Sequence, residues 1–214
     1  MRYINALRLL HDVYGRYPAS HRLHTLVRFL TCPFLRTLDV LPKSGRILEI
    51  GAGHGIYCYL AARTGNSRQV FAVEPDLRKT LLPTHAAGVR WIAGFDVCIR
   101  GAFDAIVVYD ATYRMTIEER TVIYRRIFDR LVPGGTFILK DMDPERRLKM
   151  RWARLQEWLS DSLLKVSLGS GFIYQTRAEV EATLRAIGFE GIRARRIDRF
   201  YPHPHLIYTA RKPG

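Results

Sequence analysis

The segment Arg46-Ile-Leu-Glu-Ile-Gly-Ala-Gly-His-Gly55 constrains the fold of this chain more than any other. It is a short apolar run that ends in three glycines at alternate positions, and Ile56–Arg63 then shows a helical pattern. A buried strand, a tight turn and a helix in this order predict an α/β unit. Further apolar runs predict strands at Gln69–Asp76, Val89–Ala93, Phe103–Tyr109 and Thr136–Lys140.

These strands alternate with helical patterns, which indicates a mostly parallel sheet with helices on both faces. The last two strands, Gly191–Phe200 and His205–Arg211, are joined by Tyr201-Pro-His-Pro alone, so they are expected to pair antiparallel. A length of 214 residues fits one domain, residues 1–214, with an N-terminal helical cap at 1–42 and a lid-like helical insert at 143–175. Helices are expected at Ile117–Leu131, Pro144–Val166 and Arg177–Ile187.

The cysteines and the N-terminal sequence predict a cytoplasmic protein. Cys32, Cys58 and Cys98 are odd in number and lack CxxC spacing, which argues against a disulfide framework and a thiolate zinc site. The first residues alternate apolar and charged side chains too often for the core of an export signal. No apolar stretch approaches the ~20 residues that cross a bilayer.

The glycine segment predicts a cofactor site. Glycines after a strand let the backbone turn sharply and let a ligand approach main-chain N–H groups at the start of a helix. The spacing is G-x-G-x-G rather than the G-x-G-x-x-G of dinucleotide enzymes, which disfavours NAD. Glu74 ends the second strand, where a carboxylate can accept hydrogen bonds from both ribose hydroxyls.

Four motifs together resemble those of class I S-adenosylmethionine-dependent methyltransferases. They are Ile47-Leu-Glu-Ile-Gly-Ala-Gly-His-Gly, Val73-Glu-Pro-Asp, Phe103-Asp-Ala-Ile-Val-Val and Leu131-Val-Pro-Gly-Gly-Thr. The resemblance runs from about Lys43 through the final hairpin. It implies a Rossmann-like, seven-stranded, mostly parallel sheet whose antiparallel last strand lies between the fifth and the sixth. This placement agrees with the hairpin expected from the residues alone.

The resemblance also implies roles for individual residues. The three glycines would lie beneath the methionine part of the cofactor, Glu49 would help to hold its amino group through water or backbone, and Glu74 would bind the ribose. The residue after Gly94 is usually an acid that receives the adenine amine, but here it is Phe95, so either Asp96 takes that role or Phe95 stacks on adenine. The residues expected to bind S-adenosylmethionine are Glu49, Gly51, Ala52, Gly53, Gly55, Glu74, Phe95, Asp96 and Asp110.

The acceptor of the methyl group is expected beyond the carboxyl ends of the later strands, because ligands of open α/β sheets bind there. A general base is needed only if the acceptor has a proton to lose, and Asp141 or His203 is predicted to serve. The alternative is structural: Asp141 and Asp143 cap the following helix and the Tyr-Pro-His-Pro turn is simply rigid. The residues expected to contact the acceptor are Tyr109, Tyr113, Tyr201 and His205.

Two further enzyme types are disfavoured. Asp110, Asp141 and Asp143 raise the possibility of magnesium, as in catechol-type methyltransferases of this fold, but no Asp-Asn pair follows the fifth strand, so no metal is predicted. The fourth strand ends in Tyr109-Asp-Ala-Thr rather than in the Asn/Asp-Pro-Pro-Tyr box. A DNA or glutamine N-methyltransferase is therefore not expected.

The formal net charge of +14 points to an anionic partner and says nothing about the fold. In the insert, an apolar stripe at helical spacing is predicted to pack on the domain, leaving a basic face in solvent. Alternatively, this helix and the N-terminal basic helices lie on an anionic bilayer and feed a lipid-like acceptor. The stripe is Leu148, Trp152, Leu155, Leu159 and Leu163, and the basic residues are Arg146, Arg147, Lys149, Arg151 and Arg154, with Arg2, Arg8, Arg16, Arg22 and Arg28 in the N-terminal segment.

The sequence thus predicts an S-adenosylmethionine-dependent methyltransferase that acts on a small or amphipathic acceptor, with the oligomeric state left open. An RNA methyltransferase is the first alternative, because basic residues adjoin aromatic ones at Arg90-Trp91, Arg151-Trp152 and Arg199-Phe-Tyr201. It is less expected, since no separate nucleic-acid module is apparent. A noncatalytic cofactor-binding partner protein is the second alternative.

Overall fold

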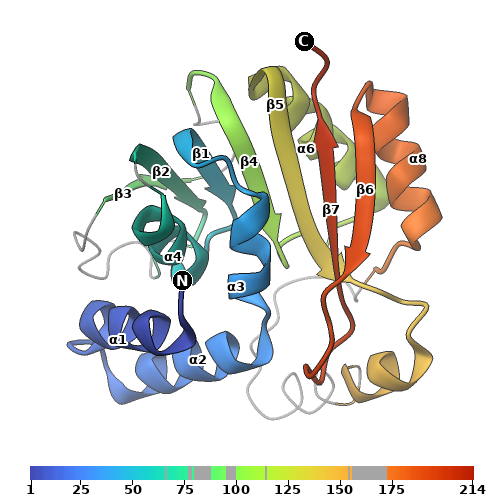
Figure 1. Cartoon of the computed structure of the whole chain (residues 1–214). Helices are drawn as coiled ribbons and strands as arrows, with labels where there is room; N and C mark the ends of the chain where they lie inside the picture. Colours follow the sequence, from blue (N-terminus) through green and yellow to red (C-terminus); the bar gives the residue numbers. More distant parts are fainter. Residues whose placement is uncertain are drawn as a thin grey trace.

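The computed structural model describes residues 1–65, 67–76, 79, 88–94, 100–113, 115–153, 155 and 173–214 (Figure 1). Its centre is a seven-stranded sheet with the strand order β3-β2-β1-β4-β5-β7-β6. The strands are β1 (Ser44–Ile50), β2 (Ser67–Glu74), β3 (Val89–Ala93), β4 (Phe103–Tyr109), β5 (Leu131–Met142), β6 (Glu190–Arg196) and β7 (His205–Arg211). The predicted fold class is confirmed.

Strand β7 runs in the opposite direction to both of its neighbours. It pairs antiparallel with both β5 and β6, whereas β1, β2, β3, β4 and β5 pair parallel with one another. The β6–β7 link is longer than predicted, because β6 ends at Arg196 and not at Phe200. Beyond that point Arg36 donates to the carbonyl of Ile197 and Lys149 donates to that of Asp198, so these backbone groups bond outside the sheet.

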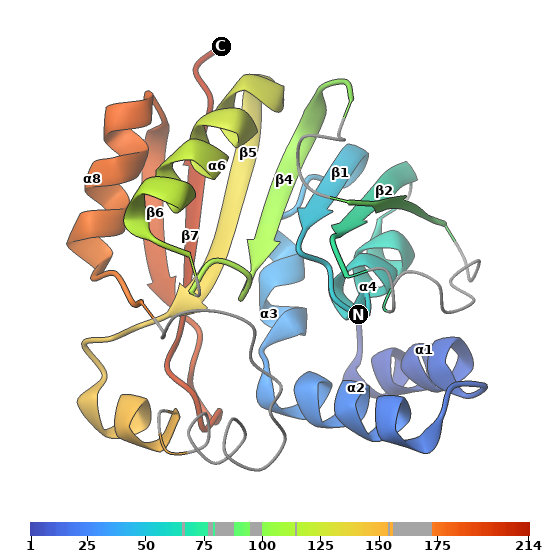
Figure 2. The same ribbon diagram turned by 180° about the vertical axis from the view of Figure 1, so that it is seen from behind.

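Helices cover both faces of the sheet (Figures 1 and 2). Helices α3 and α4 pack on one face, around a core that includes Tyr57 and Val107, and α6 and α8 pack on the other, around Tyr124 and Leu184. The helices are α1 (Tyr3–Tyr14), α2 (Ala19–Thr31), α3 (Phe34–Thr37), the 3-10 helix η1 (Leu38–Val40), α4 (Ile56–Thr64), α6 (Ile117–Arg130) and α8 (Arg177–Ile187).

Local sequence explains where α6 and α8 begin. Each follows a threonine whose hydroxyl accepts from the backbone N–H three residues on, while the glutamate there accepts from the threonine N–H. These capping boxes satisfy backbone donors that the first helical turn leaves without partners. Strand β5 departs from its prediction, since it begins at Leu131 rather than Thr136 and pairs Leu131 with Phe103 across an irregularity.

The N-terminal helices occupy the edge of the sheet at which β1, β2, β4 and β5 end. Figures 1 and 2 both place α1 and α2 at this carboxyl edge, with the short helix of residues 147–153 at the same end of the molecule. The predicted helical cap therefore lies where ligands of open α/β sheets bind. Among the described residues no helix is long and apolar enough to cross a membrane.

The apolar stripe of the insert does not pack as predicted. Leu148 is 82% exposed, and Trp152 and Leu155 are close to half exposed. Met150 and Ala153 are buried instead, so the inward face of this helix is set by smaller and more flexible side chains. The prediction that the stripe covers the domain is thus wrong for these three residues, and Leu159 and Leu163 lie outside the described part of the chain.

Candidate functional site

The loop between β1 and α4 has a backbone that requires glycine. Gly51, Gly53 and Gly55 all have positive φ angles, of 73°, 58° and 78°. The N–H groups of Gly51 and Ala52 both donate to the carbonyl of Val73, which fixes the loop to the end of β2. A Cβ added at Gly53 would meet no heavy atom within 4 Å in the described structure, so the space above the loop is open to a ligand.

Glu74 is held at the carboxyl end of β2, beside this loop. Its carboxylate is buried and accepts from the N–H of Gly53 at 2.7 Å and from the N–H of Asp76 at 3.0 Å, while Lys79 lies 3.8 Å away. A carboxylate offers about four acceptor positions. The two backbone donors therefore orient Glu74 and leave it capacity for hydroxyl donors of a ligand.

Glu49 lies beneath the loop, close to the end of β1. Its side chain is 3% exposed, and the thiol of Cys58 donates to its Oε2 at 2.8 Å. Burial raises the pKa of this carboxyl to about 8. A cation brought to the site would favour the ionised form. We call Glu49, the Gly51–Gly55 loop and Glu74 the cofactor half of the site.

The ends of β4 and β5 carry a buried ion-pair cluster. Lys140, which is 1% exposed, pairs with Asp110, and Arg28 of α2 reaches the other oxygen of Asp110 at 3.5 Å. Burial raises the pKa of the Asp110 carboxyl, but Lys140 and Arg28 outweigh it and the pKa falls below its ordinary value. Asp110 is thus a charged carboxylate between two cations, and its predicted contact with the cofactor stays a prediction.

His205 begins β7 beside this cluster and is 1% exposed. Its Nε2 lies 2.9 Å from the carbonyl of Thr31, and a carbonyl can only accept, so we assign the proton to Nε2. The Nδ1 atom is then a buried acceptor, with no hydrogen-bond partner in the part of the chain described. Burial lowers the pKa of His205, which keeps the ring neutral. We call Asp110, Lys140 and His205 the acceptor half.

The other residues predicted to contact the acceptor lie around this half. Tyr109 is buried and stacks on Phe34 at 4.7 Å, so it forms part of the wall. Tyr201 lies between the guanidinium of Arg36, at 5.1 Å, and the ring of His205, at 5.7 Å. Tyr113, after β4, stacks on Tyr174 at 6.5 Å. Their contacts with an acceptor remain predictions.

The two predicted bases are not brought together. The Asp141 carboxylate lies 3.9 Å from Arg120 of α6 and accepts from the N–H of Met142, and burial raises its pKa to about 6. His203 is half-buried, its ring centre lies 5.8 Å from that of His205, and burial lowers its pKa. His203 therefore adjoins the acceptor half as a neutral ring, whereas Asp141 is paired with a helix of the opposite face.

The three aspartates considered for magnesium are each paired with their own cations. Asp110 faces Lys140, Asp141 faces Arg120, and Asp143 accepts from Arg196 at 2.7 Å. Asp143 also accepts from the N–H of Glu145 at 3.0 Å, in the turn before the helix of residues 147–153, and the helix-capping alternative stays a prediction. Within the described residues no group of three His, Cys, Asp or Glu side chains is placed to hold a metal ion.

The N-terminal segment closes over the site through side-chain and backbone contacts that the sequence did not predict. We call α1 and α2 the N-terminal roof. It makes three polar contacts, each with a different strand end or loop: the Tyr14 hydroxyl donates to the His54 carbonyl at 2.6 Å, Arg28 pairs with Asp110, and the Thr31 carbonyl meets His205. Arg28 thus pairs with a residue of the site while its side chain stays 37% exposed, and its predicted place on a bilayer-facing surface stays a prediction.

Three histidines also gather at this boundary. The ring of His54, in the glycine loop, lies 5.5 Å from that of His21 and 5.1 Å from that of His24, both on α2. Burial lowers the pKa of His54 to about 4, so its ring is neutral at neutral pH. The position of His54 between two glycines is the one sequence signal that could have singled it out.

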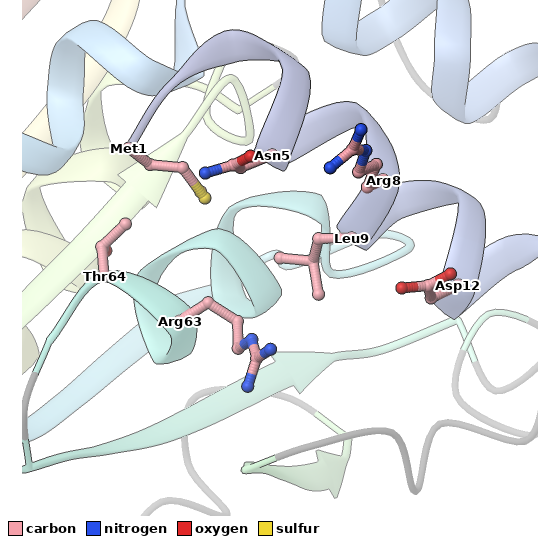
Figure 3. A pocket seen from close by; sticks show the side chains of 7 residues that line it. All are labelled: Met1, Asn5, Arg8, Leu9, Asp12, Arg63 and Thr64. Atoms are coloured by element: carbon pink, nitrogen blue, oxygen red, sulfur yellow. The ribbon is translucent and has the colours of Figure 1, made fainter.

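A cavity of about 550 Å³ lies outside these two halves, between α1 and the end of α4 (Figure 3). Arg8 and Asp12 of α1 line it together with Arg63 and Thr64 of α4. The glycine loop precedes the first residue of α4, so this cavity lies at the opposite end of that helix. It is therefore separate from the strand-edge site.

Comparison with known proteins identifies the family. A model of the methyltransferase domain matches residues 21–194, so the chain belongs to this family of methyltransferases. No curated protein sequence matches the chain.

Several solved structures share the fold. The apo form of the S-adenosylmethionine-dependent methyltransferase SibL is 18% identical with a TM-score of 0.68, covering 99% of this chain and 69% of that chain. Human N-acetylserotonin methyltransferase in complex with S-adenosylmethionine is 12% identical, with a TM-score of 0.70 over 96% of this chain and 59% of that chain. The Burkholderia thailandensis 1,6-didemethyltoxoflavin-N1-methyltransferase is 20% identical, with a TM-score of 0.63 over 99% and 89%.

The protein is thus an S-adenosylmethionine-dependent methyltransferase, and the residues of the cofactor half fit that cofactor. The open space above Gly53 admits a ligand against the backbone, Glu74 can accept from ribose hydroxyls, and the buried Glu49 suits a nearby ammonium. Phe95 and Asp96 lie outside the described residues, so the two alternatives for the adenine contact stand as they were.

Proposed function

We propose that this methyltransferase acts on a small or amphipathic acceptor bound between the acceptor half and the N-terminal roof. The observation that carries the proposal is the set of three roof contacts, to the glycine loop, the end of β4 and the start of β7. They close the strand edge with residues that also belong to the site. Such a roof favours a small acceptor, because a folded polymer would require the roof to open.

The chain's own residues would align the acceptor and exclude water. Bound S-adenosylmethionine supplies a methyl group on a positively charged sulfur. The acceptor atom bonds to the methyl carbon in line with the breaking carbon–sulfur bond, and the sulfur leaves. Rate then depends on holding that atom on the axis of the breaking bond. Buried walls such as Tyr109 and His205 restrict the acceptor, and His203, a neutral ring, would take the proton of an acceptor that loses one.

The charge of the acceptor half favours a weakly acidic acceptor. Lys140 and Arg28 bring two positive charges against the single negative charge of Asp110. The anion of an enol, phenol or carboxyl group placed there would neutralise the remaining positive charge in a site removed from water. Two of the solved neighbours are named for small molecules, N-acetylserotonin and 1,6-didemethyltoxoflavin, which supports an acceptor of small size.

Methyl-labelled S-adenosylmethionine tests the proposal directly. The purified enzyme is incubated with cell extract separated into small-molecule, lipid, RNA and protein fractions, and the label is then located. We expect label in an organic-soluble small molecule or lipid, and none with a Glu74→Ala variant. Label in RNA would favour the RNA alternative. Cofactor binding without S-adenosylhomocysteine release in any fraction would favour the noncatalytic one.

A further inference from the structure

Helix α2 is amphipathic, but most of its large apolar side chains face solvent rather than the protein. Thr25 and Phe29 are each 2% exposed, and Arg28 turns toward Asp110, so one face of α2 meets the site. The opposite face carries apolar side chains at the spacing i, i+3, i+4 and i+7, each between 44% and 63% exposed: Leu23, Leu26, Val27 and Leu30. We call this set the α2 outer face. Exposing it to water is unfavourable, and such continuous apolar patches mark contact surfaces.

The outer face continues into a groove between α1 and α2. This groove has a volume of about 420 Å³, and Leu7, Leu10, Leu23 and Leu26 contribute to its lining, with His11 and Arg22 among its polar residues. The apolar surface is therefore indented rather than flat. A flexible hydrocarbon chain can enter such a groove, because it adapts to the shape of the lining.

A second apolar strip lies at the same end of the molecule. Leu148, Trp152 and Leu155 follow the spacing i, i+4 and i+7, which is typical of one side of a helix, and they are exposed while Met150 and Ala153 are buried. Figures 1 and 2 show the helix of residues 147–153 beside the carboxyl edge of the sheet, as they show α2. Two helices from distant parts of the chain thus present large apolar side chains at one end.

The positive charge of the N-terminal segment favours an anionic surface. Residues 1–31 contain five arginines and one acidic residue, Asp12. Arg28 is used inside the site, and the four others are exposed: Arg2, Arg8, Arg16 and Arg22. A helix with an apolar face flanked by arginine is typical of segments that lie in the interface of an anionic bilayer.

We propose that the α2 outer face docks onto the surface of a bilayer containing anionic lipids, with the strip at Leu148, Trp152 and Leu155 as a second contact. The bilayer would receive the apolar side chains, and the exposed arginines would meet lipid phosphates. This docking does not depend on which acceptor is methylated. It would place the N-terminal roof, and hence the acceptor half, against the membrane.

Vesicle co-sedimentation of the full chain tests the docking. Phosphatidylcholine vesicles with phosphatidylserine should bind the protein, and vesicles of phosphatidylcholine alone should bind it far more weakly. Leu23→Gln combined with Leu30→Gln should lower the partition coefficient by about tenfold or more, because two apolar side chains no longer enter the interface. Arg16→Gln and Arg22→Gln should each lower anionic-vesicle binding by about fivefold, and added salt should lower it further.

The matched control is Ile117→Gln combined with Val122→Gln on α6. These side chains are similarly exposed, at 43% and 48%, but belong to the helices of the other face. The control should bind vesicles as the unmodified protein does, and S-adenosylhomocysteine affinity should stay unchanged in both double variants, which shows that they fold. Equal binding to neutral vesicles, no binding, or equal loss in the control would overturn the proposal. So would a dimer in solution that the Leu23/Leu30 variant dissociates, since a second copy would then cover the face.

Discussion

At the ends of β1 and β2 the site is made of backbone turns and two carboxylates, whereas at the ends of β4, β5 and β7 it is made of side chains that arrive from separate elements. The glycine loop and Glu74 hold each other through main-chain N–H groups, and Gly53 and Glu74 are 21 positions apart in the chain. Thr31 and His205 of the second region are 174 residues apart. The cofactor half is therefore locally determined, and the acceptor half depends on the whole fold.

Among substitutions in the two halves, the largest effect is expected in the acceptor half, as a loss of unfolding free energy. Lys140→Met removes one of the two cations beside Asp110, and Arg28 alone then compensates a buried carboxylate. Breaking a buried ion pair costs about 3 kcal/mol of unfolding free energy. Urea unfolding followed by circular dichroism measures it. Arg185→Met, which breaks an exposed pair with Glu181 at 2.9 Å, is the control and should cost about 0.5 kcal/mol or less.

The next effect should come from the cofactor half, mainly through binding, with some loss of stability because the N–H groups of Gly53 and Asp76 lose their acceptor. Glu74→Ala removes the acceptor expected for both ribose hydroxyls, and two charge-assisted hydrogen bonds correspond to a loss of affinity of about 100-fold or more. Calorimetry with S-adenosylhomocysteine measures this. Glu145→Ala, at an exposed glutamate beside Arg196, should leave the affinity unchanged. Unchanged affinity in the Glu74 variant would refute the ribose assignment.

Glu49 should make cofactor binding depend on pH. Its pKa of about 8 means that the carboxyl is protonated at pH 6.5 and must lose that proton to meet an ammonium group. Affinity for S-adenosylhomocysteine should therefore rise about tenfold between pH 6.5 and pH 8. Glu49→Gln should flatten the profile, and a profile that persists in this variant would assign the proton to another group.

The same raised pKa has a consequence for stability without ligand. The folded protein binds a proton at Glu49 that the unfolded chain, with an ordinary carboxyl pKa of 4.5, has already released. The proton at Glu49 therefore contributes to the free energy of unfolding below about pH 4.5, and this stabilisation is lost as the pH rises toward about 8.

The smallest effect separates backbone strain from ligand contact. Gly53 and Gly134 both have positive φ, of 58° and 74°, and an added Cβ meets no described heavy atom within 4 Å at either position. Alanine at each should lower the unfolding free energy by about 1 kcal/mol, through the left-handed backbone alone. Gly53→Ala should in addition weaken cofactor binding, and Gly134→Ala should not. Equal affinities would mean that the cofactor does not approach Gly53.

Much of the architecture could be predicted because it rests on short-range patterns. Apolar runs fixed the expected strands to within a few residues, and Thr116 and Thr176 stand three residues before glutamates that complete their caps. Glu74 was identifiable because it ends a strand beside a glycine turn. The β6–β7 link was misjudged, since its backbone bonds to Arg36 and Lys149, which no local pattern reveals.

The sequence by itself determined the order of the strands along the chain, the glycine turn and the two glutamates of the cofactor half, because backbone preferences act within a few residues. Only the tertiary structure decided the acceptor half and the direction in which α2 faces. The alternation of apolar and polar residues in α2 can be read from the sequence, but this pattern does not say which side of the helix packs on the protein. In the fold, Thr25 and Phe29 of α2 are buried and Arg28 pairs with Asp110, which leaves Leu23, Leu26, Val27 and Leu30 on the outside.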